Sequence, residues 1–375
     1  MAEGYEDFIL AGDIGGTKIN LGIFSKGGRR PLLRVFETYP SSQYPDIESI
    51  ISHFFKEHPF PIYYACFGIA GPVHHGRCSV TNLPWEVREG RIKTRFKFKQ
   101  VQLINDLTAT AFAVPYLKKN EFHVLNKGKA QKKGNLAIIA PGTGLGESIV
   151  VFDNGRYIPI PSEGGHVDFA PKNEKEVGLW RYLQKIYGHV SLERILTGQG
   201  LADIHSFFID SGHYRESGRL LKRMKDADPA MVVSEEAIKG RSRSCTAALD
   251  MFISILGSVT GNLALTGMTT GGIYLGGGIP PKILPKLKED AFFSSYTDKG
   301  RFKGILEKTP IYVILNDKAA LLGAAVRAFE IVDAQGTTSG LFYRNLKLLP
   351  STKPTQNNPD PRITGGSEPP DKKIL

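Results

Sequence analysis

The chain has 375 residues, 41% of them hydrophobic and 23% charged, and this length and composition predict a soluble globular protein of two domains. It contains no run of about 18 apolar residues that could span a membrane, and its acidic start, MAEGYEDF, lacks the basic region of a signal peptide. The net charge is +11, and basic residues cluster at 88–99 and 117–134, but no nucleic-acid-binding motif accompanies them, so we expect solvated faces and no nucleic-acid partner.

The N-terminal part of the chain predicts alternating strands and helices. Residues 8–39 read as a strand, a tight glycine turn, a second strand, a hairpin and a third strand, because short apolar runs alternate there with glycine turns. The pattern then predicts, in order, a helix at 47–56, a buried strand within 62–73, short strands near 78–82 and at 101–105, and a helix at 107–116.

The pattern of the first segment returns at residue 135. Residues 135–161 again read as strand, glycine turn, strand, hairpin and strand, and two copies of one unit suggest a duplicated architecture with two facing halves. The rest of the chain predicts a mainly helical region at 174–265, a strand, turn and helix at 272–284, a strand at 310–315 and an amphipathic helix at 318–332. Residues 349–375 are rich in Pro, Ser, Asn and charge, which predicts a disordered tail.

The three cysteines, Cys66, Cys78 and Cys245, lie far apart in the sequence. They lack the paired spacing of a disulfide framework or of a zinc motif. A sparse, odd number of cysteines favours reduced thiols, so we expect a cytoplasmic protein.

The glycine turn of each copy could hold a phosphate group, because backbone N–H groups in such a turn converge on an anion. In GDIGGTK (12–18), Gly15 and Gly16 allow close approach, and Asp13 is placed to meet a magnesium ion through water. In APGTGLG (140–146), Gly142 and Thr143 offer a second site of this kind. One such turn alone would favour a plain hairpin, whereas two equivalent turns favour phosphate binding.

Two common nucleotide-binding motifs do not fit these turns. Neither turn matches G-x-x-x-x-G-K-[ST], so the chain is not a P-loop protein. The first turn leads into a strand, where a dinucleotide-binding fingerprint requires a helix. A third glycine stretch, LGGGIP (275–280), precedes an expected helix and could accommodate the nucleoside part of a nucleotide.

Asn105 and Asp106 follow an apolar strand and precede a helix. An Asp in this position often caps the helix, and the local pattern favours that interpretation. Strand ends opposite a nucleotide site are also where α/β proteins place their reacting groups. The carboxylate could therefore accept the proton of an attacking hydroxyl group instead.

The segment PSEGGHVDFAP (161–171) places Glu163, His166 and Asp168 close together. A metal site would need further ligands, and no partner His or Cys is evident. Carboxylate and imidazole groups together can accept and donate hydrogen bonds to sugar hydroxyls. The pattern alone leaves a structural role for His166 open, and it predicts that Asp168 orients His166 or caps the next turn.

Nine motifs together resemble the bacterial-type ATP-dependent glucokinase family. In chain order from about residue 10 to residue 328 they are GDIGGT, CFGIAGPV, TNLPWEV, INDLTA, APGTGLG, PSEGGHVDFAP, GHVSLERILTGQGL, GNLALTGMTTGGIYLGGGIPP and KGRFKGILEKTPIYVI. The resemblance implies an α/β protein with the two-domain actin-like ATPase and sugar-kinase (ribonuclease H-like) fold and a cleft between the domains. We assign residues 1–116 and 318–345 to the smaller domain and 117–317 to the larger one.

The resemblance also implies a reaction, in which the γ-phosphoryl group of ATP passes to the 6-hydroxyl of glucose. ATP and Mg²⁺ are the expected cofactors, Asp13 is the expected Mg²⁺ contact through water, and a homodimer is the expected assembly. The implied site residues are the general base Asp106; the sugar contacts Asn105, Glu163, His166 and Glu193; and the nucleotide contacts Gly12, Asp13, Ile14, Gly15, Gly16, Thr17, Gly142, Thr143 and Gly277.

Two alternatives stay open. The chain could be a kinase for another hexose, such as mannose, fructose or an N-acetylated sugar. It could also be a non-catalytic sensor of sugar and nucleotide, although only about ten residues precede the first glycine turn, too few for a helix-turn-helix. The CxCGxxGCxE-type zinc motif of the related repressor and kinase family is absent from the sequence, so no structural zinc is expected.

Overall fold

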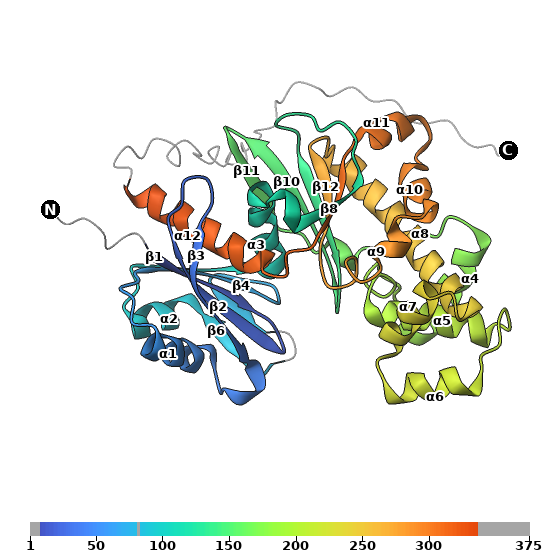
Figure 1. Cartoon of the computed structure of the whole chain (residues 1–375), viewed down its shortest axis with the longest axis horizontal. Coiled ribbons are helices and arrows are strands. Elements are labelled where there is room, and N and C mark those ends of the chain that lie inside the picture. Colours follow the sequence, from blue (N-terminus) through green and yellow to red (C-terminus); the bar gives the residue numbers. More distant parts are fainter. Residues whose placement is uncertain (1–7, 81–82, 337–375) are drawn as a thin grey trace, which may run out of the picture. The chain divides into compact units, whose positions relative to one another are not determined.

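The computed structural model of the chain describes residues 8–80 and 83–336 (Figure 1). The described residues up to Asp333 form one compact unit. The expected tail at 349–375, residues 337–345 of the expected smaller domain, and residues 81–82 at the end of one expected strand all lie outside the described residues.

The first sheet has five strands in the order β3-β2-β1-β4-β7. Its strands are β1 (Phe8–Ile14), β2 (Lys18–Ser25), β3 (Leu32–Pro40), β4 (Tyr64–Ile69) and β7 (Gln100–Asn105). β1 is antiparallel to β2 and parallel to β4, and every residue of β4 is buried, as expected for a central strand. The helices α1 (Ile47–Glu57) and α2 (Glu89–Phe96) and the hairpin of β5 (Arg77–Ser79) and β6 (Glu86–Arg88) contribute to one core with this sheet.

The second sheet has six strands in the order β11-β10-β9-β12-β13-β8. Its strands are β8 (Phe122–Asn126), β9 (Leu136–Pro141), β10 (Leu145–Asp153), β11 (Arg156–Ile160), β12 (Gly272–Leu275) and β13 (Ile311–Ile314). The first five strands in this order repeat the arrangement of the first sheet. In each sheet, three strands that are consecutive in the sequence form two antiparallel pairs, and two further strands then join in parallel. The predicted duplication is therefore confirmed.

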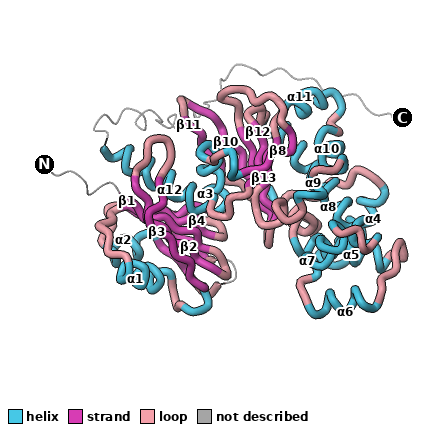
Figure 2. Tube along the Cα trace, viewed as in Figure 1, coloured by secondary structure: helices cyan, strands magenta, loops and turns pink. Residues whose placement is uncertain are grey.

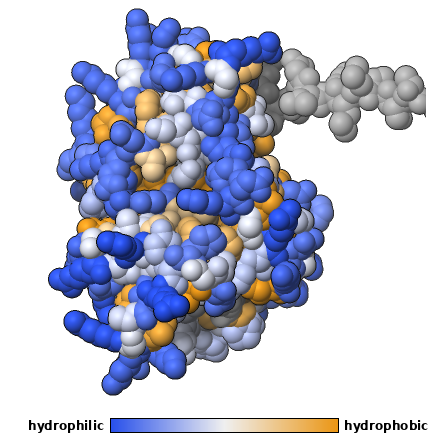
Figure 3. All heavy atoms as spheres, turned by 90° about the vertical axis from the view of Figure 1, so that its right-hand side faces the viewer, coloured by the Kyte–Doolittle hydropathy of each residue, from blue (hydrophilic) through white to orange (hydrophobic). Residues whose placement is uncertain are grey.

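Most of the helices follow the second copy of the repeat (Figure 2). The remaining α-helices are α3 (Asp106–Ala113), α4 (Glu174–Tyr187), α5 (Gly198–Asp210), α6 (Gly218–Asp226), α7 (Pro229–Ile238), α8 (Arg243–Gly267), α9 (Leu284–Leu287), α10 (Asp290–Thr297), α11 (Lys303–Lys308) and α12 (Ala319–Gly336). Short 3₁₀ helices lie at Ser41–Gln43, Val114–Tyr116, Lys119–Glu121, Gly164–His166 and Gly300–Phe302. The face of the molecule drawn in Figure 3 is mostly hydrophilic, with apolar residues scattered over it.

α8 is the central helix of the helical region. By length and composition it could cross a membrane, but 72% of its most apolar window is buried inside the fold. It packs against α5, α7 and α10, and its apolar residues belong to one large core cluster with the second sheet. Its apolar character is therefore that of a core helix.

Several elements differ from the predicted secondary structure, and β6, α10 and α11 are among those that were not predicted. The helix expected to run up to residue 284 is only the four-residue α9, because Pro280 and Pro281 disfavour helical backbone before them. α2 and β8, which lie within the two basic clusters, were not predicted. Ile92 is the only buried residue of α2, and no residue of the edge strand β8 is fully buried, so neither has a clear apolar face.

Candidate active site

The junction of β7 and α3 places Asn105 and Asp106. Asn105 caps α3, since its Oδ1 accepts hydrogen bonds from the backbone N–H of Leu107 (2.9 Å) and Thr108 (3.3 Å). Its Nδ2 donates to the carbonyl oxygen of Gly71 at 3.3 Å. The capping role that the sequence pattern favoured for Asp106 is therefore wrong: the residue before it is the cap. The amide of Asn105 has partners on both of its polar atoms, so a sugar contact would have to share them.

Asp106 is the first residue of α3, and its Oδ1 accepts a hydrogen bond from the backbone N–H of Leu107 at 2.8 Å. The pKa of this carboxyl group is raised to about 6: burial is the largest cause, the backbone hydrogen bond acts against it, and the negative charges of Asp13 and Glu163 add to the rise. Two carboxylates that are far from Asp106 in the sequence therefore act on its charge. At neutral pH Asp106 is ionised and is a stronger base than an ordinary aspartate.

Asp13 lies next to the end of β1 and pairs with Asn20 across the hairpin. Asn20 Nδ2 donates to Asp13 Oδ2 at 3.1 Å. Burial raises the pKa of Asp13, while the hydrogen bond from Asn20 and the charge of Lys18 lower it. A partly buried carboxylate next to a second acid suits a hard divalent cation such as Mg²⁺, which prefers oxygen ligands. Asp13 thus fits the predicted role.

The first glycine turn, at residues 15–17, joins β1 to β2. Gly15 N–H donates to the carbonyl oxygen of Lys18 at 3.1 Å, and Thr17 is exposed. Within β1, a Cβ at Gly12 would lie 2.3 Å from Phe67 Cδ1, so no larger residue fits where the strand packs on β4. The turn is therefore held closely against the sheet while its tip faces solvent.

The second glycine turn, at residues 142–144, packs against the third glycine stretch. Gly277 has a φ of +78°, and a Cβ there would lie 2.4 Å from the carbonyl oxygen of Pro141. The same oxygen accepts a hydrogen bond from Ile279 N–H at 3.2 Å, and Gly198, at the start of α5, donates to the Gly142 carbonyl at 3.1 Å. Two stretches assigned to one nucleotide, Gly142–Thr143 and Gly277, are therefore adjacent. The nearby N-terminus of α5, which the sequence analysis missed, adds a positive dipole end.

Glu163, His166 and Glu193, the predicted sugar contacts, form a polar cluster. Nε2 of His166 lies 3.9 Å from Oε2 of Glu163, and its Nδ1 lies 3.9 Å from Oε1 of Glu193. The side chains of Glu163 and His166 are 69% and 60% exposed, and that of Glu193 is 32% exposed. Two acids on either side of an accessible imidazole offer several acceptors and a donor to a polyhydroxylated ligand.

Glu193 also connects this cluster to the second glycine turn. Its Oε2 accepts a hydrogen bond from the backbone N–H of Leu145 at 2.9 Å, and its own N–H donates to the Gly165 carbonyl at 2.8 Å. A Cβ at Gly144 would lie 2.8 Å from the same Oε2. One carboxylate therefore fixes the end of the turn with one oxygen and faces His166 with the other.

Asp168 does not orient His166 or share a centre with it. Its Oδ1 lies 2.8 Å from Nε2 of His189, and its side chain is 90% exposed. The expectation for Asp168 is therefore wrong, because the strand-like pairing of Asp168 with Ser191 directs it toward the next segment. The acids and imidazole of the segment 161–171 do not form a metal cage.

Glu147 is a residue of this region that the sequence analysis missed. It lies on β10, is 7% exposed, and its Oε1 has no hydrogen-bond partner. Burial raises its pKa to about 7. A Cβ at Gly164 would lie 2.5 Å from Glu147 Oε2, so this carboxyl group lies directly beneath the loop that carries Glu163. A Glu within the predicted strand LGESIVVF, just before its apolar run IVVF, was the signal that could have pointed to it.

The chain is similar to known proteins over most of its length. The glucokinase family profile matches residues 10–331. The chain is 38% identical over 346 residues to a glucokinase from Synechocystis sp. and covers 98% of it, with 86% of this chain aligned. It is similar in structure to a glucokinase from an Antarctic psychrotroph, with 30% identity, a TM-score of 0.78, and coverage of 86% of this chain and 99% of that one.

A more distant structure supports the fold alone. A ROK family glucokinase from Streptomyces griseus, solved in complex with glucose and AMPPNP, is 20% identical, with a TM-score of 0.56 and coverage of 86% of this chain and 99% of that one. The predicted α/β sugar-kinase fold is therefore confirmed. Family profile and relatives agree over most of the length, and the chain belongs to the glucokinase family.

Proposed function

We propose that the protein transfers the γ-phosphoryl group of ATP to the 6-hydroxyl of glucose, with Asp106 as the general base. ATP-dependent phosphorylation of glucose is the activity of the family to which the chain belongs. The observation that carries the assignment of the base is the position of Asp106 beside β4, because a Cβ at Gly68, the strand partner of Asp13, would lie 3.7 Å from Asp106 Cα. The charges of Asp13 and of Glu163, one from each set of predicted contacts, also raise the pKa of Asp106.

Sugar binding falls to the cluster of Glu163, His166 and Glu193. Their side chains are accessible, and they offer the acceptors and donors that neighbouring hydroxyl groups require. Asn105 contributes through the polar atoms that already cap α3 and bind Gly71. Together these groups hold the 6-hydroxyl within reach of Asp106, so that an encounter between two substrates becomes a positioned reaction.

In the transfer step, Asp106 takes the proton of the 6-hydroxyl as O6 forms a bond to the γ-phosphorus. The bond from that phosphorus to the oxygen it shares with the β-phosphate breaks, and ADP leaves with the electron pair. A carboxylate with a pKa of about 6 is ionised at neutral pH and yet basic enough to help. Because phosphoryl transfer needs little covalent chemistry from the protein, positioning and electrostatics supply most of the rate enhancement.

The glycine turns take the phosphates. The donors are backbone N–H groups at 16–17 and 143–144, because those of Gly15 and Gly142 already bond the carbonyl oxygens of Lys18 and Gly144. Gly277 lets the chain pass close to the second turn, beside the place of the nucleoside part. Asp13 is the group that would hold Mg²⁺ through water, and when bound the ion would neutralise phosphate charge. Asn20 keeps the Asp13 carboxylate in place for this role.

Domains, assembly and location complete the proposal. One domain comprises 1–116 with 318–345 and the other comprises 117–317, and the two close over the substrates. α12 is assigned to the first domain because it packs tightly on α3, where a Cβ at Gly323 would lie 1.6 Å from the Ala109 carbonyl oxygen.

The chain works as a homodimer in the cytoplasm. Its three cysteines are free and buried, which suits a reducing compartment. Light scattering of the protein as it elutes from a size-exclusion column measures the oligomeric state.

The direct test is purified protein with MgATP and glucose, assayed for glucose 6-phosphate and ADP in equal amounts. A panel of mannose, fructose and N-acetylglucosamine under the same conditions separates a glucokinase from a kinase for another hexose. Binding of glucose and ATP without turnover would favour the sensor. The expected result is the highest kcat/KM for glucose.

A further inference from the structure

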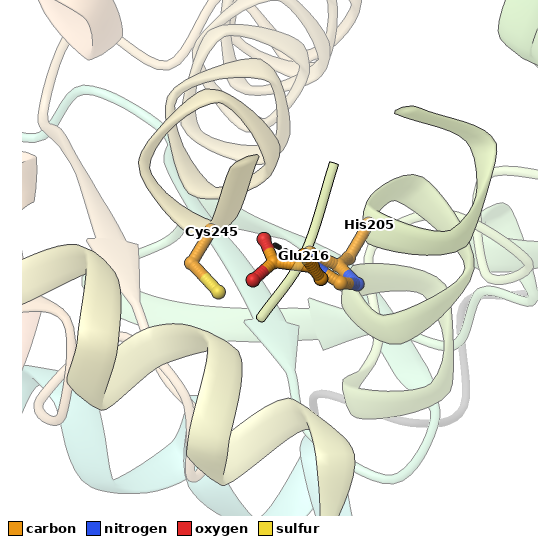
Figure 4. Close-up of side chains that lie close together, drawn as sticks. All are labelled: His205, Glu216 and Cys245. Atoms are coloured by element: carbon orange, nitrogen blue, oxygen red, sulfur yellow. Dashed lines mark ion pairs between the residues drawn. The ribbon is translucent and has the colours of Figure 1, made fainter. Parts of the chain in front are cut away.

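His205, Glu216 and Cys245 form a cluster that the kinase reaction does not use (Figure 4). His205 comes from α5, Glu216 from the loop before α6, and Cys245 from the first turn of α8. One ligand atom from each of the three lies within 4.8 Å of the other two. Figure 4 shows the Glu216 carboxylate between the thiol and the imidazole.

The cluster is buried, although its acid comes from an exposed loop. The side chains of His205 and Glu216 are each 5% exposed, and Cys245 is fully buried. Arg215 and Ser217, on either side of Glu216, are exposed. A single carboxylate is therefore turned inward from the surface, and burying it without a compensating positive charge or hydrogen bonds is costly.

The distances suit a small cation as well as a hydrogen bond. His205 Nε2 lies 3.5 Å from Glu216 Oε1, which is long for a charged hydrogen bond. Two ligand atoms about 2.0–2.1 Å from a tetrahedral zinc ion lie about 3.3–3.5 Å apart. A His, a Glu and a Cys are all zinc ligands, and a neutral His with two anionic ligands balances the charge of Zn²⁺ in a buried site.

The groups around the cluster hold its ligands in place. Ser242 Oγ donates to Glu216 Oε1 at 3.0 Å, and Ser244 Oγ also contacts that oxygen. Such hydrogen bonds orient a metal ligand from outside. Cys245 is the third residue of the 25-residue α8, where the helix N-terminus favours a thiolate. Burial, on the other hand, raises the pKa of this thiol and lowers that of His205, so zinc would bind a neutral imidazole and displace the thiol proton.

We infer that His205, Glu216 and Cys245 bind one structural Zn²⁺ ion, with water or Ser244 Oγ at the fourth position. The ion would tie α5, the loop before α6 and the start of α8 together, far along the chain from the catalytic Asp106. The competing interpretation is a metal-free network in which Glu216 accepts hydrogen bonds from the two serines and pairs with His205, whose Nε2 lies 3.1 Å from Ser244 Oγ. Both account for the burial of Glu216, and only the first requires the thiol.

The test begins with the tag-free full chain, loaded with Zn²⁺ and passed through chelating resin. We expect about one zinc per chain by elemental analysis, and, after exchange with Co²⁺, a thiolate-to-cobalt charge-transfer absorption in the near ultraviolet. This readout needs no variant, so it stands even if a substitution prevents folding. Less than about one tenth of a zinc per chain together with no such absorption overturns the inference.

Variants then separate the two interpretations. Cys245→Ser keeps the His205–Glu216–Ser244 contacts and should lose bound zinc and the cobalt absorption, while Cys78→Ser, a second buried cysteine outside the cluster, should retain both. A chelator should lower the Tm of the wild type and of Cys78→Ser but not that of Cys245→Ser. Equal zinc content in the two variants, or a Tm that no chelator changes, overturns the proposal. Because the kinase residues are elsewhere, glucose phosphorylation by Cys245→Ser at 25 °C should stay within about twofold of wild type.

Discussion

The two copies of the strand–turn–strand unit share a backbone plan but carry different side chains. Each has a three-residue turn, at 15–17 between β1 and β2 and at 142–144 between β9 and β10. The next-to-last residue of the strand before the turn is Asp13 in the first copy and Ala140 in the second. The first copy therefore has its own acid, and the second receives one from outside, because Glu193 accepts the Leu145 N–H.

This difference suggests a division of labour. The first copy places a carboxylate where a cation and phosphates are expected, and the second ties its turn to the sugar cluster through Glu193. Both sheets lie against the start of α3: a Cβ at Gly68, on β4 beside β1, would lie 3.7 Å from Asp106 Cα, and one at Gly146, on β10, would lie 2.8 Å from Leu107 Cδ2. The two copies thus share a backbone arrangement, and single side chains give each copy a different role.

The largest effect is expected at Asp106, the first residue of α3. Asp106→Asn keeps the shape and removes the base, so kcat should fall by roughly 10²–10⁴-fold while the KM for ATP changes little. Steady-state kinetics at saturating glucose measures this. Near-wild-type turnover in Asp106→Asn would remove Asp106 from its role. Asp168→Asn, at the exposed acid paired with His189, is the matched control and should keep its activity.

A smaller effect is expected from the acid of the first copy. Asp13→Asn should raise the Mg²⁺ concentration that gives half-maximal activity by about 10–100-fold, because a group that orients a metal ion is lost. Titrating Mg²⁺ at fixed ATP measures the shift, with the KM for glucose unchanged. An unchanged Mg²⁺ requirement in Asp13→Asn would contradict the claim that the first copy supplies the acid for the cation.

Glu193→Gln, at the acid that reaches the second copy from outside, should act on the sugar instead. Loss of one charged hydrogen bond is worth about 1.5 kcal/mol or more, so the KM for glucose should rise at least about tenfold. Calorimetric titration with glucose checks this without turnover. The same substitution should leave the Mg²⁺ requirement unchanged, and a change in both quantities would contradict the division of labour.

The buried acid beneath the sugar loop should affect stability more than rate. Burial raises the pKa of Glu147 from 4.5 to about 7, so the folded state binds the proton more tightly than the unfolded state between these values. The free energy of unfolding then falls as pH rises through this window, and above pH 7 the loss is complete. Glu147→Gln removes the charge and should be more stable than wild type at pH 8 by up to about 3 kcal/mol, with little difference near pH 4.5.

Urea unfolding of Glu147→Gln and wild type at both pH values measures the difference. Glu174→Gln, at an exposed glutamate, is the control and should match wild type at both. Equal stability of Glu147→Gln and wild type at pH 8 would contradict the assigned burial of the charge.

The elements with a clear period could be predicted from the sequence. Both hairpin units, the helical region and α12 follow from apolar spacing, and the glycine turns follow from their repetition. The Asn105–Asp106 pair shows the limit, since both side chains are good caps and only the backbone at residue 105 decides between them. Which distant residues meet was not predictable: Glu147 reaches Gly164, and His205 reaches Glu216 and Cys245, only through tertiary packing.

The central claim is that a carboxyl group with a raised pKa, Asp106, takes the proton of the glucose hydroxyl. The pH dependence of kcat/KM for glucose tests it most directly, because this ratio reports the essential groups of the free enzyme. With saturating MgATP, the ratio should rise about tenfold per pH unit below pH 6 and level off above it, in line with a pKa of about 6. A profile that is flat between pH 5 and 8, or an acid limb that persists unchanged in the residual activity of Asp106→Asn, would contradict the account.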